Sequence, residues 1–296
     1  LEWGKLLSMA GVKKGDLRLL AQSVDCYRRA DQCYKDNPSV LAHWGETLVF
    51  MASFTEDIEC LKEAEKVIIR ALEICPESIE TWVIYGRCLL EFARYFHDDQ
   101  YIHQAISYFQ KAIKSAPKNE HAYRGLAVAY SILGEMFSDY TLYERALDVY
   151  AQCETLEHHP EELYEEWGTS LLKLAEVFNR REHIEAAVEK FELALEIQRS
   201  QDNINIDLLY NYGCALDYLG DYYENGDYYQ KAIHTLDQVL VIEPSYSNAR
   251  YNLALAYSHL GEVSLETDYL YQAIEHFQIL SKEDPEDDLV WHDWGV

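Results

Sequence analysis

A pattern of residues recurs every 41 positions through this 296-residue sequence. Two segments show it directly: AYRGLAVAYSILGE at residues 122–135 and ARYNLALAYSHLGE at residues 249–262. From Ala127, steps of 41 residues, with a single step of 45, always reach a small residue: Gly4, Gly45, Gly86, Gly168, Gly213, Ala254 and Gly295. A register that persists through the whole chain indicates one structural unit repeated about seven times.

Further columns of the repeat predict two helices in each unit. A large apolar or aromatic residue precedes every small residue, and a second small residue, such as Ala105, follows nineteen positions later. Phe109 and Ala112 then follow Ala105 at spacings of four and three, which places all three on one face of a helix. Prolines close four of the units: Pro76, Pro117, Pro244 and Pro285. Each unit is therefore predicted to be an antiparallel pair of amphipathic helices, A and B, with proline ending B.

The helix limits can be estimated from capping residues. In the unit that starts at residue 79, we expect helix A over about 79–96 and helix B over about 100–116, with Asp98 or Asp99 as the N-cap of helix B. Side chains of the same type precede the other B helices: Asp57, Asp139, Asn179, Asp227 and Asp268.

The order Trp82-x2-Tyr85-Gly86-x2-Leu89, followed by Ala105-x3-Phe109-x2-Ala112-x4-Pro117, resembles the tetratricopeptide repeat. The resemblance implies an all-α, right-handed solenoid of antiparallel helix pairs. The family's unit has about 34 residues, whereas here seven extra residues follow the position of Gly134, Gly220 and Gly261. Because seven residues are about two helical turns, we expect longer helices and protruding A–B turns such as FHDDQY and YYENGDYY. The four-residue excess falls in IQRSQDNINID, which we expect to be a hinge.

The unbroken register predicts a single array over residues 1–296 rather than separate domains. The units are expected at about 1–37, 38–78, 79–119, 120–160, 161–205, 206–246 and 247–287, with the start of another helix at 288–296. Because the sequence begins and ends inside predicted A helices, we expect it to be part of a longer protein. No apolar run is long enough to span a bilayer, so no membrane insertion is expected.

The net charge of −27 narrows the classes of partner. Residues 206–296 carry seventeen acidic and three basic residues, whereas residues 1–37 carry five acidic and seven basic residues. Nucleic acid is a poor partner because its phosphates require cationic neutralisation. The acidic excess either solvates exposed helices or attracts a basic partner segment. The seven scattered cysteines form no CxxC pair, which predicts reduced thiols and a cytoplasmic location.

The resemblance also implies that A helices line an inner groove where a protein or peptide binds. Positions three before and one, four and five after each small residue should face that groove. Eight of these positions are our candidates for partner binding: Arg87, Arg124, Glu165, Tyr210, Asp217, Tyr218, Tyr251 and His259. Tyrosine suits a recognition surface, although packing between successive A helices would explain the tyrosines equally well. We expect the partner to be basic where it meets the C-terminal units, and open array ends also permit self-association.

No catalytic, cofactor-binding or metal-binding motif is found, so a non-catalytic interaction scaffold without cofactors is predicted. The best metal candidate, HDDQYIH at residues 97–103, fits ordinary helix capping better. Two alternatives stay open at this stage. One is a chaperone-like holder of client proteins, and the other is a regulatory array of a larger enzyme or signalling protein.

Overall fold

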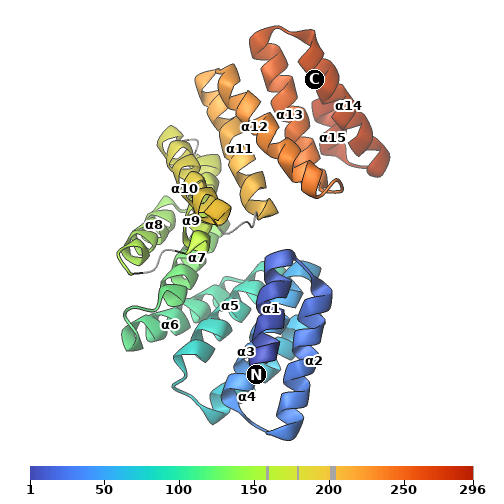
Figure 1. Ribbon diagram of the computed structural model, residues 1–296. Helices are drawn as coiled ribbons and strands as arrows, with labels where there is room; N and C mark the ends of the chain where they lie inside the picture. The colour runs from blue at the N-terminus through green and yellow to red at the C-terminus, as the bar shows by residue number, and fades with distance from the viewer. Residues whose placement is uncertain (158–159, 179, 201–204, 296) are drawn as a thin grey trace. The chain divides into compact units, whose positions relative to one another are not determined.

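The computed structural model describes all residues except 158–159, 179, 201–204 and 296. These described residues form fifteen α-helices and no strand, which confirms the predicted all-α fold (Figure 1). The chain divides into two compact units, residues 1–158 and 159–296. These two units are described separately below. The prediction of a single array over residues 1–296 stays a prediction.

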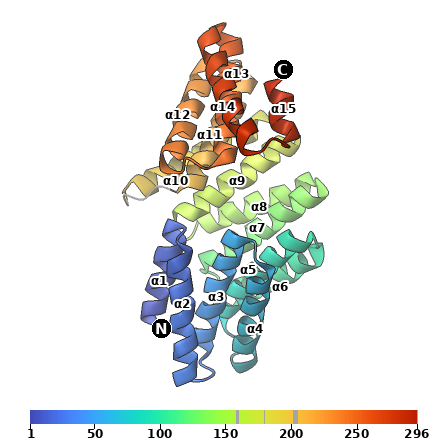
Figure 2. The ribbon, with the colours of Figure 1, turned by 90° about the vertical axis from the view of Figure 1, so that its right-hand side faces the viewer.

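The first unit, unit 1, contains eight helices arranged as four A–B pairs (Figures 1 and 2). Their bounds are α1 (Glu2–Lys14), α2 (Leu17–Cys33), α3 (Pro38–Thr55), α4 (Ile58–Ile74), α5 (Ile79–Phe96), α6 (Asp99–Ser115), α7 (Glu120–Phe137) and α8 (Tyr140–Glu154). The A helices α3, α5 and α7 each have 18 residues.

The second unit, unit 2, contains three A–B pairs and a further short helix. The bounds are α9 (Glu161–Phe178), α10 (Arg181–Ser200), α11 (Ile206–Tyr223), α12 (Gly226–Ile242), α13 (Ser247–Ser264), α14 (Thr267–Glu283) and α15 (Asp288–Trp294). The 45-residue step lies between the starts of α9 and α11. Of the predicted hinge at residues 197–207, residues 197–200 belong to α10 and 206–207 to α11, and residues 201–204 lie outside the described residues.

Short A–B turns fix the antiparallel pairing. Between α5 and α6 only two residues are non-helical: His97, in the left-handed region at φ 52°, and Asp98, whose carboxylate accepts the backbone N–H of Gln100 at 2.9 Å. Asp57 and Asp139 cap α4 and α8 in the same way. The helices absorb the extra residues, as expected: α5 has 18 residues and α6 has 17, and the connection between them is only two residues long.

The predicted caps in the C-terminal repeats need correction. Asn225 rather than Asp227 caps α12, because its side chain accepts the N–H of Asp227 at 3.0 Å. Glu266 occupies the N-cap position of α14 without a side-chain cap bond, and Asp268 lies within the first turn. The predicted cap Asn179 lies outside the described residues.

Two glycines let an aromatic ring of helix B touch the backbone of two A helices. Phe109 of α6 is fully buried. A Cβ placed on Gly86 of α5 would lie 2.6 Å from its ring, and one on Gly125 of α7 would lie 2.4 Å away. Both distances are shorter than real Cβ contacts allow, so the ring occupies space that only glycine leaves. This interlock joins consecutive pairs into a continuous core.

The A helices form the more closely packed side of each unit. In unit 1, α3 contacts α5 and α5 contacts α7, and in unit 2 α11 contacts both α9 and α13. Among the described residues, no two successive B helices make contacts of similar extent. We use the term A face for the side formed by α3, α5 and α7 in unit 1, and separately for the side formed by α9, α11 and α13 in unit 2.

The A–B turn between α13 and α14 combines two unfavourable residues, which leads to a stability prediction. Leu265 has φ 61°, a conformation in which its Cβ is crowded, and Glu266 makes no cap bond. Changing Leu265→Gly together with Glu266→Asp should raise the free energy of unfolding by about 1–2 kcal/mol. Thermal unfolding monitored by circular dichroism measures this. A decrease in the unfolding temperature would contradict the assigned turn.

Candidate functional site

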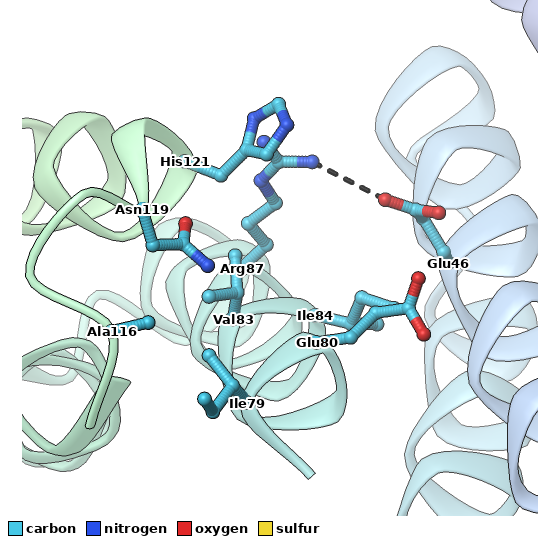
Figure 3. A pocket seen from close by; sticks show the side chains of 9 residues that line it. All are labelled: Glu46, Ile79, Glu80, Val83, Ile84, Arg87, Ala116, Asn119 and His121. Carbon is cyan, nitrogen blue, oxygen red and sulfur yellow. Dashed lines mark hydrogen bonds and ion pairs between the residues drawn. The ribbon is translucent and has the colours of Figure 1, made fainter. Parts of the chain in front are cut away.

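A cavity of about 480 Å³ lies on the A face of unit 1 (Figure 3). Its apolar lining comes mainly from α5, which contributes Ile79, Val83 and Ile84. The polar lining comes from three segments: Glu46 of α3, Glu80 and Arg87 of α5, and Asn119 and His121 at the start of α7. A cavity that combines an apolar wall with a few polar groups is typical of binding sites.

Glu46 is the electrostatic centre of this cavity. Its Oε1 lies 3.4 Å from Nη1 of Arg87, and its Oε2 lies 3.4 Å from Nδ1 of His43. Burial raises the pKa of Glu46, but the hydrogen bond with His43 and the charge of Arg87 outweigh burial and hold this pKa below its ordinary value. Glu46 is therefore a charged carboxylate that two side chains position.

His121 faces the opposite electrostatic influence. Burial lowers the pKa of its imidazole, and the positive charges of Arg87 and Arg124 lower it further. Its neutral ring can both donate and accept a hydrogen bond. The cavity thus offers a partner an apolar wall, one charge-paired carboxylate and a neutral imidazole.

On the A face of unit 2, candidate residues bond to the next A helix. Asn252 Nδ2 of α13 donates to the Tyr210 hydroxyl of α11 at 2.8 Å, and the Tyr251 hydroxyl of α13 donates to Asp293 of α15. Tyr210 also lies against Tyr246, with ring centroids 5.3 Å apart. Both candidate tyrosines are half-buried. Packing between successive A helices therefore occupies their hydroxyl groups.

Asp217 and Asp221 of α11 and His259 of α13 form a polar network. Nδ1 of His259 lies 3.2 Å from Asp217 Oδ1 and 3.4 Å from Asp221 Oδ1, and the Tyr229 hydroxyl donates to Asp221 at 2.8 Å. Burial lowers the pKa of His259, but the hydrogen bond and charge of Asp217 outweigh it, so this pKa is raised.

These three groups also have the chemistry of metal ligands, and their ligand atoms lie within 4.8 Å of one another. The ion pair between His259 and the carboxylates accounts for the arrangement without a cation. Asp217 is only 8 % exposed, and burial raises its pKa. The network therefore joins α11 to α13.

Glu165 of α9 is a partly buried carboxyl group without a cationic partner among its described contacts. Its two carboxylate oxygens accept Nδ2 of Asn205 at 2.9 and 3.0 Å. Burial, together with the negative charge of Glu166, raises the pKa of Glu165 to about 7. It can therefore exchange a proton near neutral pH.

The structure separates the eight sequence candidates by exposure. Arg124 and Asp217 are buried at 6 % and 8 % exposure, and Tyr218 is the most exposed at 39 %. The other five, Arg87, Glu165, Tyr210, Tyr251 and His259, have intermediate exposure. Only Asp217 and His259 bond directly to each other in the described contacts. The role of the eight candidates in partner binding stays a prediction.

Several groups at these sites were not among the eight candidates, although Glu46, one residue after Gly45, occupies a predicted groove position. They are Glu46, Glu80, Asn119 and His121 in unit 1, and Asp221, Asn252 and Asp293 in unit 2. The repeat itself carries the missing signal, because Glu46 and Arg87 are 41 residues apart and Tyr251 and Asp293 are 42 residues apart. Comparing side chains one repeat apart would have identified such pairs.

The structure also describes the segment HDDQYIH and the seven cysteines. In the segment of residues 97–103, Asp98 is the N-cap of α6 and His103 Nε2 lies 3.8 Å from Asp99 Oδ2, as expected for capping and a weak surface pair. All seven cysteines are free thiols.

Comparison with known proteins identifies the repeat. A family model described as "Tetratricopeptide repeat" matches residues 221–288. Two solved tetratricopeptide repeat structures share the fold. The first is YrrB, described as "a TPR protein with an unusual peptide-binding site", with TM-score 0.53, 17 % identity, and coverage of 77 % of this chain and 98 % of YrrB. The second is TTC0263 of Thermus thermophilus, with TM-score 0.54, 18 % identity, and coverage of 72 % of this chain and 98 % of TTC0263. The chain therefore has the tetratricopeptide repeat fold, and residues 221–288 match the family itself.

Three further comparisons give less specific information about this chain. A model described as "Plant specific mitochondrial import receptor subunit TOM20" matches residues 20–136, within unit 1. PilF of Pseudomonas aeruginosa has TM-score 0.52 and 17 % identity, with coverage of 87 % of this chain and 98 % of PilF. No curated protein matches the sequence significantly. Among the described helices, none is both long and apolar enough to cross a membrane.

Proposed function

We propose that this protein is a non-catalytic scaffold that binds a partner polypeptide on its A face. The observation that carries the proposal is the cavity of about 480 Å³ in unit 1, where an apolar wall adjoins Glu46, Arg87 and His121. These groups can hold an apolar side chain and hydrogen-bond the backbone beside it. The solved relative YrrB supports the proposal, because it is described as having a peptide-binding site.

Unit 2 supports a preference for basic segments. Residues 206–296 have seventeen acidic and three basic residues, so their field attracts cationic chains. Tyr218 is the candidate tyrosine that offers the largest exposed fraction to a partner. Tyr210 and Tyr251 instead contribute to packing, so replacing them would disturb the helices as well as the surface. Tyr218 is therefore the better position for a binding test.

We predict that Tyr218→Ala weakens binding of the partner by more than about 1 kcal/mol, roughly a five-fold loss of affinity. The partner is first isolated by affinity purification with the intact chain and then titrated calorimetrically. The matched control is Tyr271→Ala, because Tyr271 is a 64 % exposed tyrosine on the B helix α14 of the same unit. Equal losses in both variants, or no loss in either, would exclude this part of the A face.

Salt dependence tests the electrostatic component of the same proposal. Affinity should fall as ionic strength rises from about 0.05 to 0.5 M, because salt screens the acidic field. Salt-independent binding would assign the acidic excess to solvation of the surface. Binding of many unrelated unfolded chains with similar affinity would favour the chaperone-like alternative instead.

The match of residues 20–136 favours a second candidate, a receptor subunit for protein import. Such a receptor would also bind polypeptides, so the two candidates differ mainly in location. Cell fractionation separates them: recovery with mitochondria supports the receptor, and recovery in the cytoplasm supports the location predicted from the cysteines. The regulatory array of a larger enzyme would be recognised by a catalytic domain in the same gene product.

A further inference from the structure

The final turn of every A helix from α3 to α13 carries an exposed apolar side chain at the same register position. In each of these 18-residue helices, the seventeenth residue is large and apolar. These residues and their exposed fractions are Phe54 46 %, Tyr95 48 %, Met136 36 %, Val177 40 %, Tyr222 49 % and Val263 42 %. Isolated exposed apolar residues are ordinary, but six in one register indicate a shared surface property.

In unit 1 these positions belong to a larger apolar surface, which we call the turn edge: Phe54, Tyr95, Phe96, Met136 and Phe137. Phe96 and Phe137 are 47 % and 55 % exposed. The helices α3, α5 and α7 run in the same direction and contact one another in order, so their last turns lie at one edge of the unit. Exposed apolar patches of this kind mark interaction sites.

The extra residues of the repeat explain why this edge exists. Relative to the family unit of about 34 residues, the additional seven follow the position of Gly134, and Met136 and Phe137 are among them. A Cβ on Gly134 would lie 2.7 Å from the Tyr143 ring, so the close A–B packing includes this level of the helix. The added turn extends past that contact. Phe96 stacks on Tyr101 of α6, with ring centroids 6.1 Å apart, yet about half of the Phe96 surface stays exposed.

The charges beside the turn edge indicate which kind of partner could bind there. The segments 54–62, 95–103 and 136–144 contain seven acidic residues and one lysine. Lys62 lies 2.7 Å from Glu59 and compensates that one charge, and Arg94 in the last turn of α5 is paired with Glu91, so the remaining carboxylates leave a negative excess. A second copy of the chain would bring the same negative charge, and an anionic membrane would be repelled. An apolar surface with an acidic border instead complements a cationic amphipathic helix.

We propose that the turn edge of unit 1 is a second binding surface, separate from the A face, for an amphipathic helical segment with apolar residues on one face and lysine or arginine on the other. The apolar side chains contact Phe96 and Phe137, and the cationic side chains lie near carboxylates such as Glu56, Glu59 and Asp99. This surface does not depend on the A-face proposal, because it uses no residue of the cavity.

The test uses an 18-residue helical peptide of leucine and lysine as the probe, labelled for fluorescence anisotropy and titrated with the intact chain. The double change Phe96→Ser with Phe137→Ser should weaken its binding at least ten-fold. The control is Tyr34→Ser, because Tyr34 is 78 % exposed and lies at the end of α2, on the opposite edge of unit 1. It should change affinity less than two-fold, and circular dichroism should show that both variants stay folded.

Two further arms test the charge. A peptide with glutamate in place of lysine should bind at least ten-fold more weakly, and the triple change Glu56→Lys, Glu59→Lys and Asp99→Lys should weaken the lysine peptide similarly. The proposal is overturned if the lysine peptide does not bind, if both peptides bind equally, or if Tyr34→Ser loses as much affinity as the double change. It is also overturned if the intact chain binds anionic vesicles through this edge, or if the double change dissociates a dimer. Tyr218→Ala should leave peptide binding unchanged, which separates this surface from the A face.

Discussion

Replacing Phe109 by alanine should lower the free energy of unfolding of unit 1 by about 3–5 kcal/mol. The ring is fully buried and lies against the backbones of Gly86 and Gly125. Glycine has no side chain that could move into the space, so the cavity left by the substitution cannot collapse easily. Urea unfolding monitored by circular dichroism measures the loss.

The matched control is Phe137→Ala. Phe137 is 55 % exposed at the end of α7, so its truncation should cost less than about 1 kcal/mol. Similar losses for both phenylalanines would contradict the interlock between helix B and the two neighbouring A helices. A loss for Phe109→Ala below about 1 kcal/mol would do the same.

Removing the charge of Glu165 should stabilise unit 2 above pH 7. The pKa of this carboxyl is raised from its ordinary value of 4.5 to about 7. A raised acid pKa means that the folded state binds the proton more tightly than the unfolded state does. The stabilisation from this proton is fully present below about pH 4.5 and is lost as pH rises through about 7.

Glu165→Gln should therefore raise the free energy of unfolding at pH 8 by about 2–3 kcal/mol, since one pKa unit corresponds to about 1.4 kcal/mol. Glutamine keeps an oxygen that can accept Nδ2 of Asn205. At pH 4 the two proteins should be equally stable. The control Glu189→Gln changes an exposed glutamate of α10 and should have an effect below about 0.5 kcal/mol at either pH. A pH-independent difference for Glu165→Gln would contradict the raised pKa of this carboxyl.

The helix pairs and their register could be predicted from the sequence, together with the resemblance to the tetratricopeptide repeat. Local rules suffice for this, because small residues at fixed spacings, prolines and capping side chains act within one unit. The expected helix 79–96 agrees with α5 (Ile79–Phe96), and the expected cap Asp98 is the observed one. Where the local signal was ambiguous the prediction failed, as at Asp227, where Asn225 two positions earlier accepts the cap bond instead.

Which groove positions are available depends on contacts between helices, and the repeat register alone does not predict them. Arg124 and Tyr218 both satisfied the same register rule, yet one is 6 % and the other 39 % exposed. Exposure depends on the side chains that neighbouring helices contribute, such as Asn252 against Tyr210 and Asp293 against Tyr251, and these lie 42 residues further along the chain. Periodicity assigns a residue to a face of its own helix, whereas burial, hydrogen bonding and pKa arise from contacts between helices. The cavity around Glu46 and the raised pKa of Glu165 therefore became visible only in three dimensions.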